Sequence, residues 1–272
     1  MEFNPLKPFS WQAYVINLAA AQHRWQSMQS RLATAGIPYI RVEAIRGVDL
    51  SEPYTDFDEV GHRRRTGRRP IPPEIGCYLS HLKAIDAFLE SGQTHGLIVE
   101  DDAIFAPEFM ATVEAALAKS DAWDVLRLQT VNRNRVIPAC PIDPNHSLGV
   151  NLTRSKGAAA YMLNRRAAEA FRRRLRPMRL AYDIAFDLEY LWGLRAVAIT
   201  PYPVKADTAA PTQIQMNINA YKEGAARYLT VFPFRAAVET ARVACRLRLL
   251  ASLLRRGRTG LQSRGRARPE SI

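Results

Sequence analysis

The chain has 272 residues, of which 47% are hydrophobic and 9% aromatic, as expected for a globular protein with one large domain or two small ones. Its net charge of +12 is concentrated in two segments: nine arginines and no acid lie in residues 242–268, and five arginines lie in residues 63–69. Without these fourteen arginines the chain carries a formal charge of −2, which argues against a basic nucleic-acid-binding face.

The cysteines and the terminal composition indicate the compartment. The cysteines are far apart and form no Cys-x-x-Cys pair, which argues against a disulfide scaffold or a zinc site and favours a reducing compartment; they are Cys77, Cys140 and Cys245. No apolar signal segment opens the chain, and no run of about 18 apolar residues predicts a membrane span. The expected location is therefore the cytoplasm.

Hydrophobic periodicity predicts an α/β domain. Strands are expected at residues 14–18, 39–43, 97–100, 124–128, 157–163 and 196–200, and helices at residues 22–35, 73–91, 107–119, 165–175 and 181–194. This alternation is typical of right-handed βαβ units in a mostly parallel sheet. Residues 46–73 and 130–155 lack periodicity and are expected to form long loops, and residues 201–220 to wrap back over the sheet.

Three consecutive carboxylates follow the strand that ends the first hundred residues. Glu100, Asp101 and Asp102 come directly after Gly96-Leu-Ile-Val99. Carboxylates this close repel one another unless water, a cation or a positively charged ligand is bound. Mg²⁺ and Mn²⁺ prefer oxygen ligands and are often held by one or two carboxylates together with a diphosphate. The motif therefore favours a metal and nucleotide-sugar site.

Acidic residues after a strand also occur in helix caps and in phosphoreceiver domains. A cap at the start of the next helix needs one acid, and three in a row exceed that need. A phosphoreceiver domain has a similar acidic pair, yet it needs an Asp at the end of a later strand, and the strand after residue 124 ends in Gln129. The metal site is the preferred interpretation.

The C-terminal segment is expected to form a basic amphipathic helix over residues 226–256, followed by a disordered basic tail at 257–272. Its apolar residues share one stripe at helical spacing: Ala236, Val243, Ala244, Leu247, Leu250, Ala251 and Leu254. Most arginines of the segment lie off that stripe. Such a helix suits the surface of an anionic membrane, and the alternative is that it packs on its own domain.

Several motifs together resemble glycosyltransferase family 25, which includes bacterial lipopolysaccharide and lipooligosaccharide transferases and the collagen galactosyltransferases. The most specific are Glu74-Ile-Gly-Cys-Tyr-Leu-Ser80-His81 and Leu97-Ile-Val-Glu-Asp-Asp102, in the family's order. Val15-Ile-Asn17-Leu18 with Arg24 resembles the opening strand, and Gly157–Leu163 resembles a later strand. Asp183 lies where the family tends to place an Asp. The resemblance spans about residues 14–214, within a predicted domain of residues 1–225.

The resemblance implies an A-type glycosyltransferase fold in which an acidic motif holds Mn²⁺ or Mg²⁺ against a UDP-sugar, often UDP-galactose. The acceptor it implies is a sugar of a lipid-linked oligosaccharide. Asp102 is the expected metal ligand. The expected donor-binding residues are Asn17, Arg24, Ser80, His81, Glu100 and Asp101. If the reaction inverts the anomeric carbon, a carboxylate base is required, with Asp183 the first candidate and Asp187, four residues on, the second.

Two other classes of function stay open. One is an inactive family member that acts as a binding module, because Ala19 and Arg46 depart from the family's usual residues. The other is a polyanion binder, suggested by the sequence pI of about 10.0. The preferred prediction is a hexosyltransferase of surface-glycan biosynthesis on the cytoplasmic face of the inner membrane, without a nucleic-acid partner.

Overall fold

The computed structural model describes residues 10–132, 135–207 and 218–266. The strands are β1 (Trp11–Asn17), β2 (Tyr39–Glu43), β3 (His95–Glu100), β4 (Ala103–Phe105), β5 (Val125–Arg127), β6 (Val136–Pro141), β7 (Ser147–Asn151), β8 (Ala160–Asn164), β9 (Ala196–Thr200) and β10 (Val204–Ala206). The α-helices are α1 (Gln22–Ala35), α2 (Glu59–Thr66), α3 (Pro72–Glu90), α4 (Phe109–Leu117), α5 (Arg165–Arg174), α6 (Tyr182–Phe186) and α7 (Tyr228–Arg266), with five short 3-10 turns between them.

An eight-stranded sheet forms the centre of the fold, in the order β2-β1-β3-β8-β5-β9-β7-β6. β1 pairs in parallel with β2 and β3, and β5 pairs in parallel with β9. β8 and β7 run against their neighbours, so six of the eight strands point the same way. The predicted mixed α/β fold with a mostly parallel sheet is confirmed.

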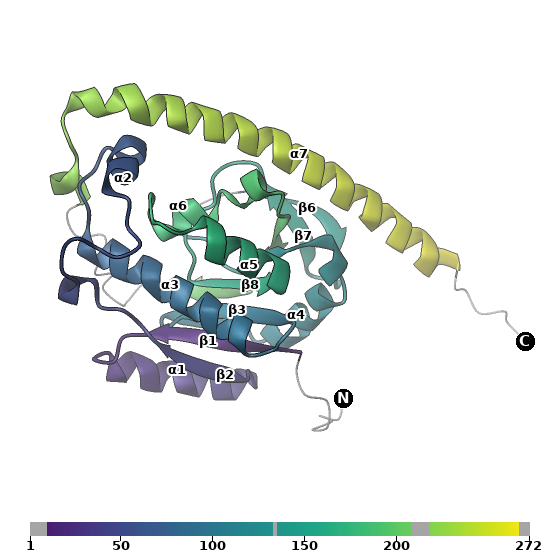
Figure 1. Cartoon of the computed structure of the whole chain (residues 1–272). Helices are drawn as coiled ribbons and strands as arrows, with labels where there is room; N and C mark the ends of the chain where they lie inside the picture. Colours follow the sequence, from purple (N-terminus) through teal and green to yellow (C-terminus); the bar gives the residue numbers. More distant parts are fainter. Residues whose placement is uncertain (1–9, 133–134, 208–217, 267–272) are drawn as a thin grey trace, which may run out of the picture.

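The alternation of side chains along the strands places a core on each face of the sheet. In β1, Tyr14 and Ile16 belong to the core under α3 and α5, whereas Ala13 and Val15 belong to the core under α1 and α4. Both faces are buried, which explains the nearly continuous apolar sequence of β1 and β3. Figure 1 shows α3 and α5 on one side of the sheet and α1 on the other.

Three predicted segments differ from the structure. The loop of residues 46–73 contains helix α2. Asp58 caps the start of this helix by accepting a hydrogen bond from the Gly61 N–H, and Gly67 ends the helix in the left-handed conformation. Residues 130–155 contain the hairpin of β6 and β7, which extends the sheet at one edge. The helix expected at 181–194 is only α6 and a 3-10 turn at Glu189–Trp192, because the α-helix ends after Phe186.

Of residues 201–220, Val204–Ala206 form β10 against β4, and residues 208–217 lie outside the described residues.

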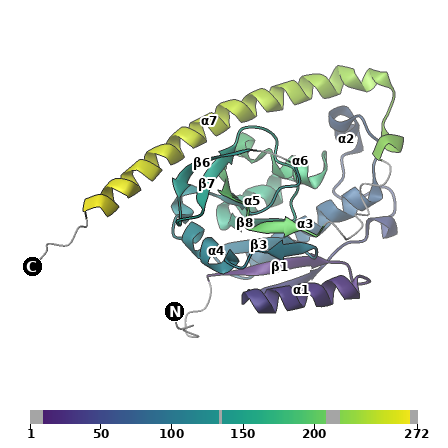
Figure 2. The ribbon, with the colours of Figure 1, turned by 180° about the vertical axis from the view of Figure 1, so that it is seen from behind.

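Helix α7 crosses the molecule as a long rod beside α2, β6 and β7, and its C-terminal end projects beyond the body of the protein (Figures 1 and 2). It continues to Arg266, past the predicted end at residue 256; residues 267–272 lie outside the described range. Its inward face carries Arg242 and Arg246, which are 0% and 3% exposed. No described helix, α7 included, is both long and apolar enough to cross a membrane.

The predicted apolar stripe of α7 therefore faces outward. Its exposed members include Val243, Leu247 and Leu254, and the stripe continues towards the start of the helix through Phe232 and the 80%-exposed Leu229. The helix thus packs on its own domain through a face with two arginines and presents apolar side chains to the outside. The inward face also buries Val231, Val238 and Leu253, so α7 carries apolar side chains on both faces, whereas an ordinary surface helix has one apolar stripe.

Candidate active site

A pocket of about 180 Å³ opens where the parallel strands β1 and β3 end, and we call it the β1–β3 pocket. Residues 44–48 and helix α3 form its other walls. All seven residues predicted to bind donor or metal line it: Asn17, Arg24, Ser80, His81, Glu100, Asp101 and Asp102. The structure therefore brings together side chains that lie up to 85 positions apart in the sequence.

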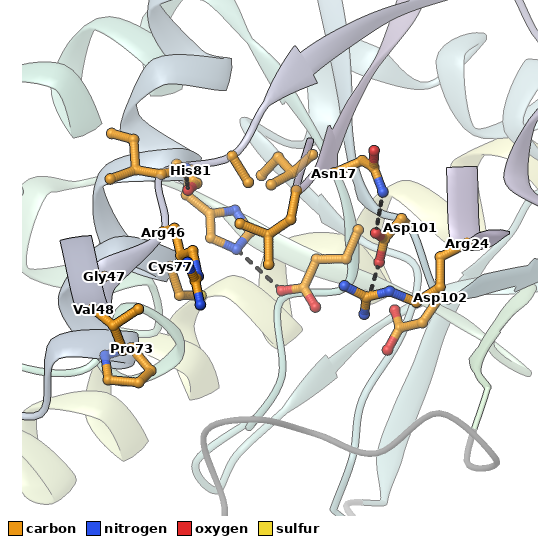
Figure 3. A pocket seen from close by; sticks show the side chains of 16 residues that line it. Asn17, Arg24, Arg46, Gly47, Val48, Pro73, Cys77, His81, Asp101 and Asp102 are labelled. Carbon is orange, nitrogen blue, oxygen red and sulfur yellow. Dashed lines mark hydrogen bonds and ion pairs between the residues drawn. The ribbon is translucent and has the colours of Figure 1, made fainter. Parts of the chain in front are cut away.

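Asp101 is fixed by groups from β1 and α1. Its carboxylate accepts a short hydrogen bond from the Asn17 side-chain amide and lies 3.2 Å from the Arg24 guanidinium. The side-chain oxygen of Asn17, Oδ1, in turn accepts a hydrogen bond from Arg41 Nε at 3.1 Å. Figure 3 shows Asp101 between Asn17 and Arg24. Asp101 and Asn17 are therefore held by their hydrogen bond to each other, and Arg24 supplies positive charge at the pocket.

Asp102 has a different environment. Its Oδ1 is buried and has no hydrogen-bond partner among the described residues. Burial, followed by the nearby charges of Glu100 and Asp101, raises the pKa of Asp102 to about 7. A buried acceptor without a donor is costly, and a cation removes that cost. This donor set of carboxylate oxygens suits Mg²⁺ or Mn²⁺.

His81 is a buried residue in the wall of the β1–β3 pocket. Its Nε2 lies 3.2 Å from a Glu100 carboxylate oxygen, and its Nδ1 lies 3.1 Å from the Tyr161 hydroxyl. The ring stacks on Tyr182 at a centroid distance of 3.9 Å. These contacts orient the Glu100 carboxylate at the pocket. Cys77, His81 and Glu100 also bring one ligand atom each within 4.8 Å of one another, so they form a second group that is able to hold a metal ion.

Ser80 shapes the pocket through the backbone. Its hydroxyl donates to the Gly76 carbonyl at 2.7 Å and accepts from the Ile45 N–H at 2.8 Å. A Cβ on Gly76 would lie 2.5 Å from both the Gly47 nitrogen and the Ile45 oxygen. Residues 45–47 therefore pack directly on α3 because residue 76 has no side chain. Neither Gly76 nor Gly47 is among the predicted site residues, although Gly76 lies inside the most specific motif.

A second pocket of about 610 Å³ lies between α6 and the start of α7, and we call it the α7 pocket. It shares Cys77, His81, Glu100 and Asp102 with the β1–β3 pocket. The carboxylates Glu100 and Asp102 therefore stand where the two pockets meet, a geometry that allows two ligands to approach the same point.

The two candidate bases separate in space. Asp183 lines the α7 pocket, where burial raises its pKa above the ordinary value although the Gly157 and Ile184 N–H groups oppose that effect. Asp187 caps the end of α6 and is completely buried. It pairs with Arg127, Arg242 and Arg246 at 2.9, 3.0 and 2.8 Å. The expected common helical face does not exist because α6 ends between the two residues.

Comparison with known proteins gives a family and distant structural similarities. The sequence profile of glycosyltransferase family 25 (LPS biosynthesis protein) matches residues 11–186. No curated protein matches the sequence significantly. The structure of S. aureus TarS 1-349 in complex with UDP-GlcNAc is 14% identical, with 90% of this chain and 71% of that chain covered and a TM-score of 0.43.

Two further structures are similar to a comparable degree. A protein from STIV is 14% identical over 72% of this chain and 83% of its own, with a TM-score of 0.41. A glycosyltransferase involved in the glycosylation of the major capsid of PBCV-1 is 9% identical over 69% of this chain and 81% of its own, with a TM-score of 0.35.

Proposed function

The chain belongs to glycosyltransferase family 25, and on that premise we propose that it transfers a hexose, galactose first among the candidates, from a UDP-sugar to a hydroxyl of a lipid-linked oligosaccharide. The observation that carries this proposal is the position of Glu100 and Asp102 at the junction of two pockets. The donor occupies the β1–β3 pocket and the acceptor the α7 pocket. The reaction inverts the anomeric carbon.

The protein performs three tasks in this mechanism. Asp102 would hold a divalent cation, Mn²⁺ or Mg²⁺, with Glu100 beside it, and such an ion would supply charge neutralisation for the leaving UDP. Arg24 adds positive charge close to the diphosphate, and Asn17 keeps Asp101 in place. The walls hold donor and acceptor at a fixed distance, which replaces a bimolecular encounter by a positioned one.

Asp183 is the proposed general base. It stands in the acceptor pocket, and its raised pKa brings it nearer to the pH at which it has to accept a proton from the acceptor hydroxyl. Deprotonation strengthens that hydroxyl as a nucleophile, and the attack on the anomeric carbon releases UDP on the opposite side. Asp187 is assigned to structural support of the pocket because three buried arginines surround it.

A panel of UDP-sugars tests the proposal. Hydrolysis and binding are measured with Mn²⁺ and with chelator, on the wild type, on Asp102→Ala and on Glu169→Ala, a control carboxylate exposed on α5. We expect metal-dependent turnover of one UDP-sugar that Asp102→Ala abolishes and Glu169→Ala retains. Folded protein that binds no UDP-sugar with metal would contradict the proposal and favour an inactive binding module.

The outward face of α7 is the proposed membrane contact. Its exposed apolar residues, Leu229, Phe232, Val243, Leu247 and Leu254, lie on the same helix as the exposed Arg248, Arg255 and Arg258. Apolar side chains that insert at the headgroup level next to cations are complementary to an anionic bilayer. The same helix contributes to the α7 pocket, so a lipid-linked acceptor would reach the pocket from the membrane surface.

Point substitutions test the membrane contact better than truncation. Deleting residues 235–268 would remove Arg242 and Arg246 and leave Asp187 and Glu189 without these two buried partners. We expect Phe232→Ser with Leu247→Ser to reduce cosedimentation with vesicles containing phosphatidylserine, with Thr240→Ser as the control. Unchanged cosedimentation would contradict the membrane contact. If the wild-type chain is a dimer in solution and the double variant is a monomer, the outward face of α7 binds a second copy of the chain instead.

A further inference from the structure

One wall of the α7 pocket is strongly basic. It is built from the end of α2, the segment before β8, and the start of α7 with the residues that lead into it. These parts contribute cationic side chains that line the pocket: Arg65, Lys156, Lys222, Arg227 and Arg235. The charges come from three separate parts of the chain, and the fold brings them to one cavity.

None of these five side chains lies within ion-pair distance of a carboxylate, as far as the described residues show. The other two arginines of the pocket are paired: Arg68 with Glu74 at 2.9 Å and Arg154 with Glu239 at 2.9 Å. The protein thus neutralises two arginines of the pocket by close ion pairs and leaves the other five cations outside such pairs in the described structure.

Two of the five cations, Arg65 and Arg227, are half-buried, whereas Lys156, Lys222 and Arg235 are exposed. The Arg65 guanidinium lies 5.7 Å from the centre of the Phe234 ring. Burial and the neighbouring Arg179 lower the pKa of Arg65. Cations gathered in a partly buried cavity repel one another, and a bound anion relieves this repulsion through charge-assisted hydrogen bonds.

The acids of the same pocket are committed elsewhere. Glu74 is held by Arg68, and Glu100 and Asp102 line the border with the donor pocket. Asp183 is the proposed base. Asp58 lies near Arg65, and Asp183 near Lys156, but neither forms a close ion pair with the wall in the described structure. Five cations therefore face two nearby carboxylates, and an anionic ligand would balance the remaining positive charge.

We propose that the basic wall binds an anionic group of the acceptor, a phosphate or carboxylate on the saccharide near the hydroxyl that is glycosylated. The proposal rests on the transferase function proposed above. The enzyme then selects acidic acceptors over neutral ones, because a neutral saccharide would leave the mutual repulsion of the clustered cations unrelieved. Lys222 and Arg235 are exposed and belong to the part of the wall beside and within α7, so they are chosen for substitution.

The test compares paired acceptors on the full chain. The probes are a deacylated, phosphorylated lipooligosaccharide with its phosphatase-treated form, and a uronic-acid-bearing saccharide with its carboxyl-reduced form. The double variant Lys222→Gln with Arg235→Gln removes two charges from the wall. Arg173→Gln with Arg174→Gln removes the same charge from exposed positions of α5 that do not line the pocket.

We expect the wall variant to raise the acceptor KM at least about tenfold for the matching acidic saccharide and to leave UDP-sugar hydrolysis unchanged. The pair that loses its preference identifies the group as phosphate or carboxylate. The control variant should keep the wild-type KM, because Arg173 and Arg174 lie on α5 and do not line the pocket.

Three results would overturn the inference. They are equal KM values for acidic and neutral forms in the wild type, an equal rise in the control variant, and a rise in the UDP-sugar KM, which would assign the wall to the donor diphosphate. Calorimetric titration of the same saccharides is run in parallel. If no UDP-sugar is turned over, the transferase function fails, and the titration still decides whether the wall prefers an anion.

Discussion

Substitution of the two carboxylates near α6 should affect different properties: the stability of the protein at Asp187 and its kcat at Asp183. Asp187 is completely buried and lies within 3.0 Å of three guanidinium groups, from Arg127, Arg242 and Arg246. Asp187→Asn keeps the shape but removes the charge, so these cations have fewer buried anions to pair with. Removing one partner of a buried ion pair costs about 3–5 kcal/mol, which lowers the Tm of a domain of this size by about 6–20 °C.

Asp183→Asn should instead leave folding almost unchanged, because the amide oxygen still accepts from the Gly157 N–H. We expect its free energy of unfolding to stay within about 1 kcal/mol of the wild type, as is usual for substitutions that keep the local contacts. Its kcat for transfer should fall by about 10²–10⁴-fold, the usual contribution of a general base.

Urea unfolding and transfer kinetics on both variants separate the two roles. Kinetics are recorded at low temperature, where Asp187→Asn is still folded by circular dichroism, and there it should retain most of its kcat. A stable Asp187→Asn protein without turnover would refute the assignment and make Asp187 the base. Wild-type kcat in Asp183→Asn would refute the mechanism.

Three further predictions concern the pocket walls and the packing of α2. His62 is buried with neither ring nitrogen hydrogen-bonded in the described structure, and burial lowers its pKa to about 4; since the unfolded chain protonates near pH 6.5, this site should cost about 2 kcal/mol of stability between pH 7 and pH 5. Urea titrations should show that loss diminished in His62→Leu, and an unchanged pH dependence would contradict it. Gly76→Ala should displace residues 45–47 and raise the Kd for UDP-sugar at least about tenfold, whereas Gly224→Ala, with open space around it, should not; equal Kd values would refute the close contact as a determinant of binding. Ser80→Ala leaves the Ile45 N–H without its acceptor, so unfolding free energy should fall by about 1–3 kcal/mol; a Ser80→Ala protein as stable as the wild type would show that this bond is dispensable.

The central sheet and the donor side of the site were accessible to sequence reasoning. Buried strands of a parallel sheet are nearly continuous apolar runs, so β1 and β3 stand out, and polar residues directly after them meet at one edge. Asn17 and Asp101 are both expected to bind the donor, and the structure places them in hydrogen-bond contact. The hairpin of β6 and β7 was not predicted, because three prolines and a polar turn interrupt its pattern.

The roles of similar residues inside the site were not accessible in the same way. Ser80 and Gly76 belong to the most specific motif, yet only the packing of residues 45–47 on α3 shows that they shape a backbone wall. Asp183 and Asp187 have the spacing of one helical face, but α6 ends between them. Periodicity predicts which side chains share a face only for as long as the helix continues.

In helix α7 the sequence determines the helical pattern, and the tertiary structure determines which face is buried. The sequence alone determined that residues 236–254 form a helix with an apolar stripe, because spacing fixes which side chains share a face. It did not determine which face meets the domain. The inward face buries Val238 and Leu253 in the two cores. It also places Arg246 beside Asp187 and Glu189, which lie some 57–59 positions earlier in the chain. Buried carboxylates require cations, and only the folded chain shows which cations reach them.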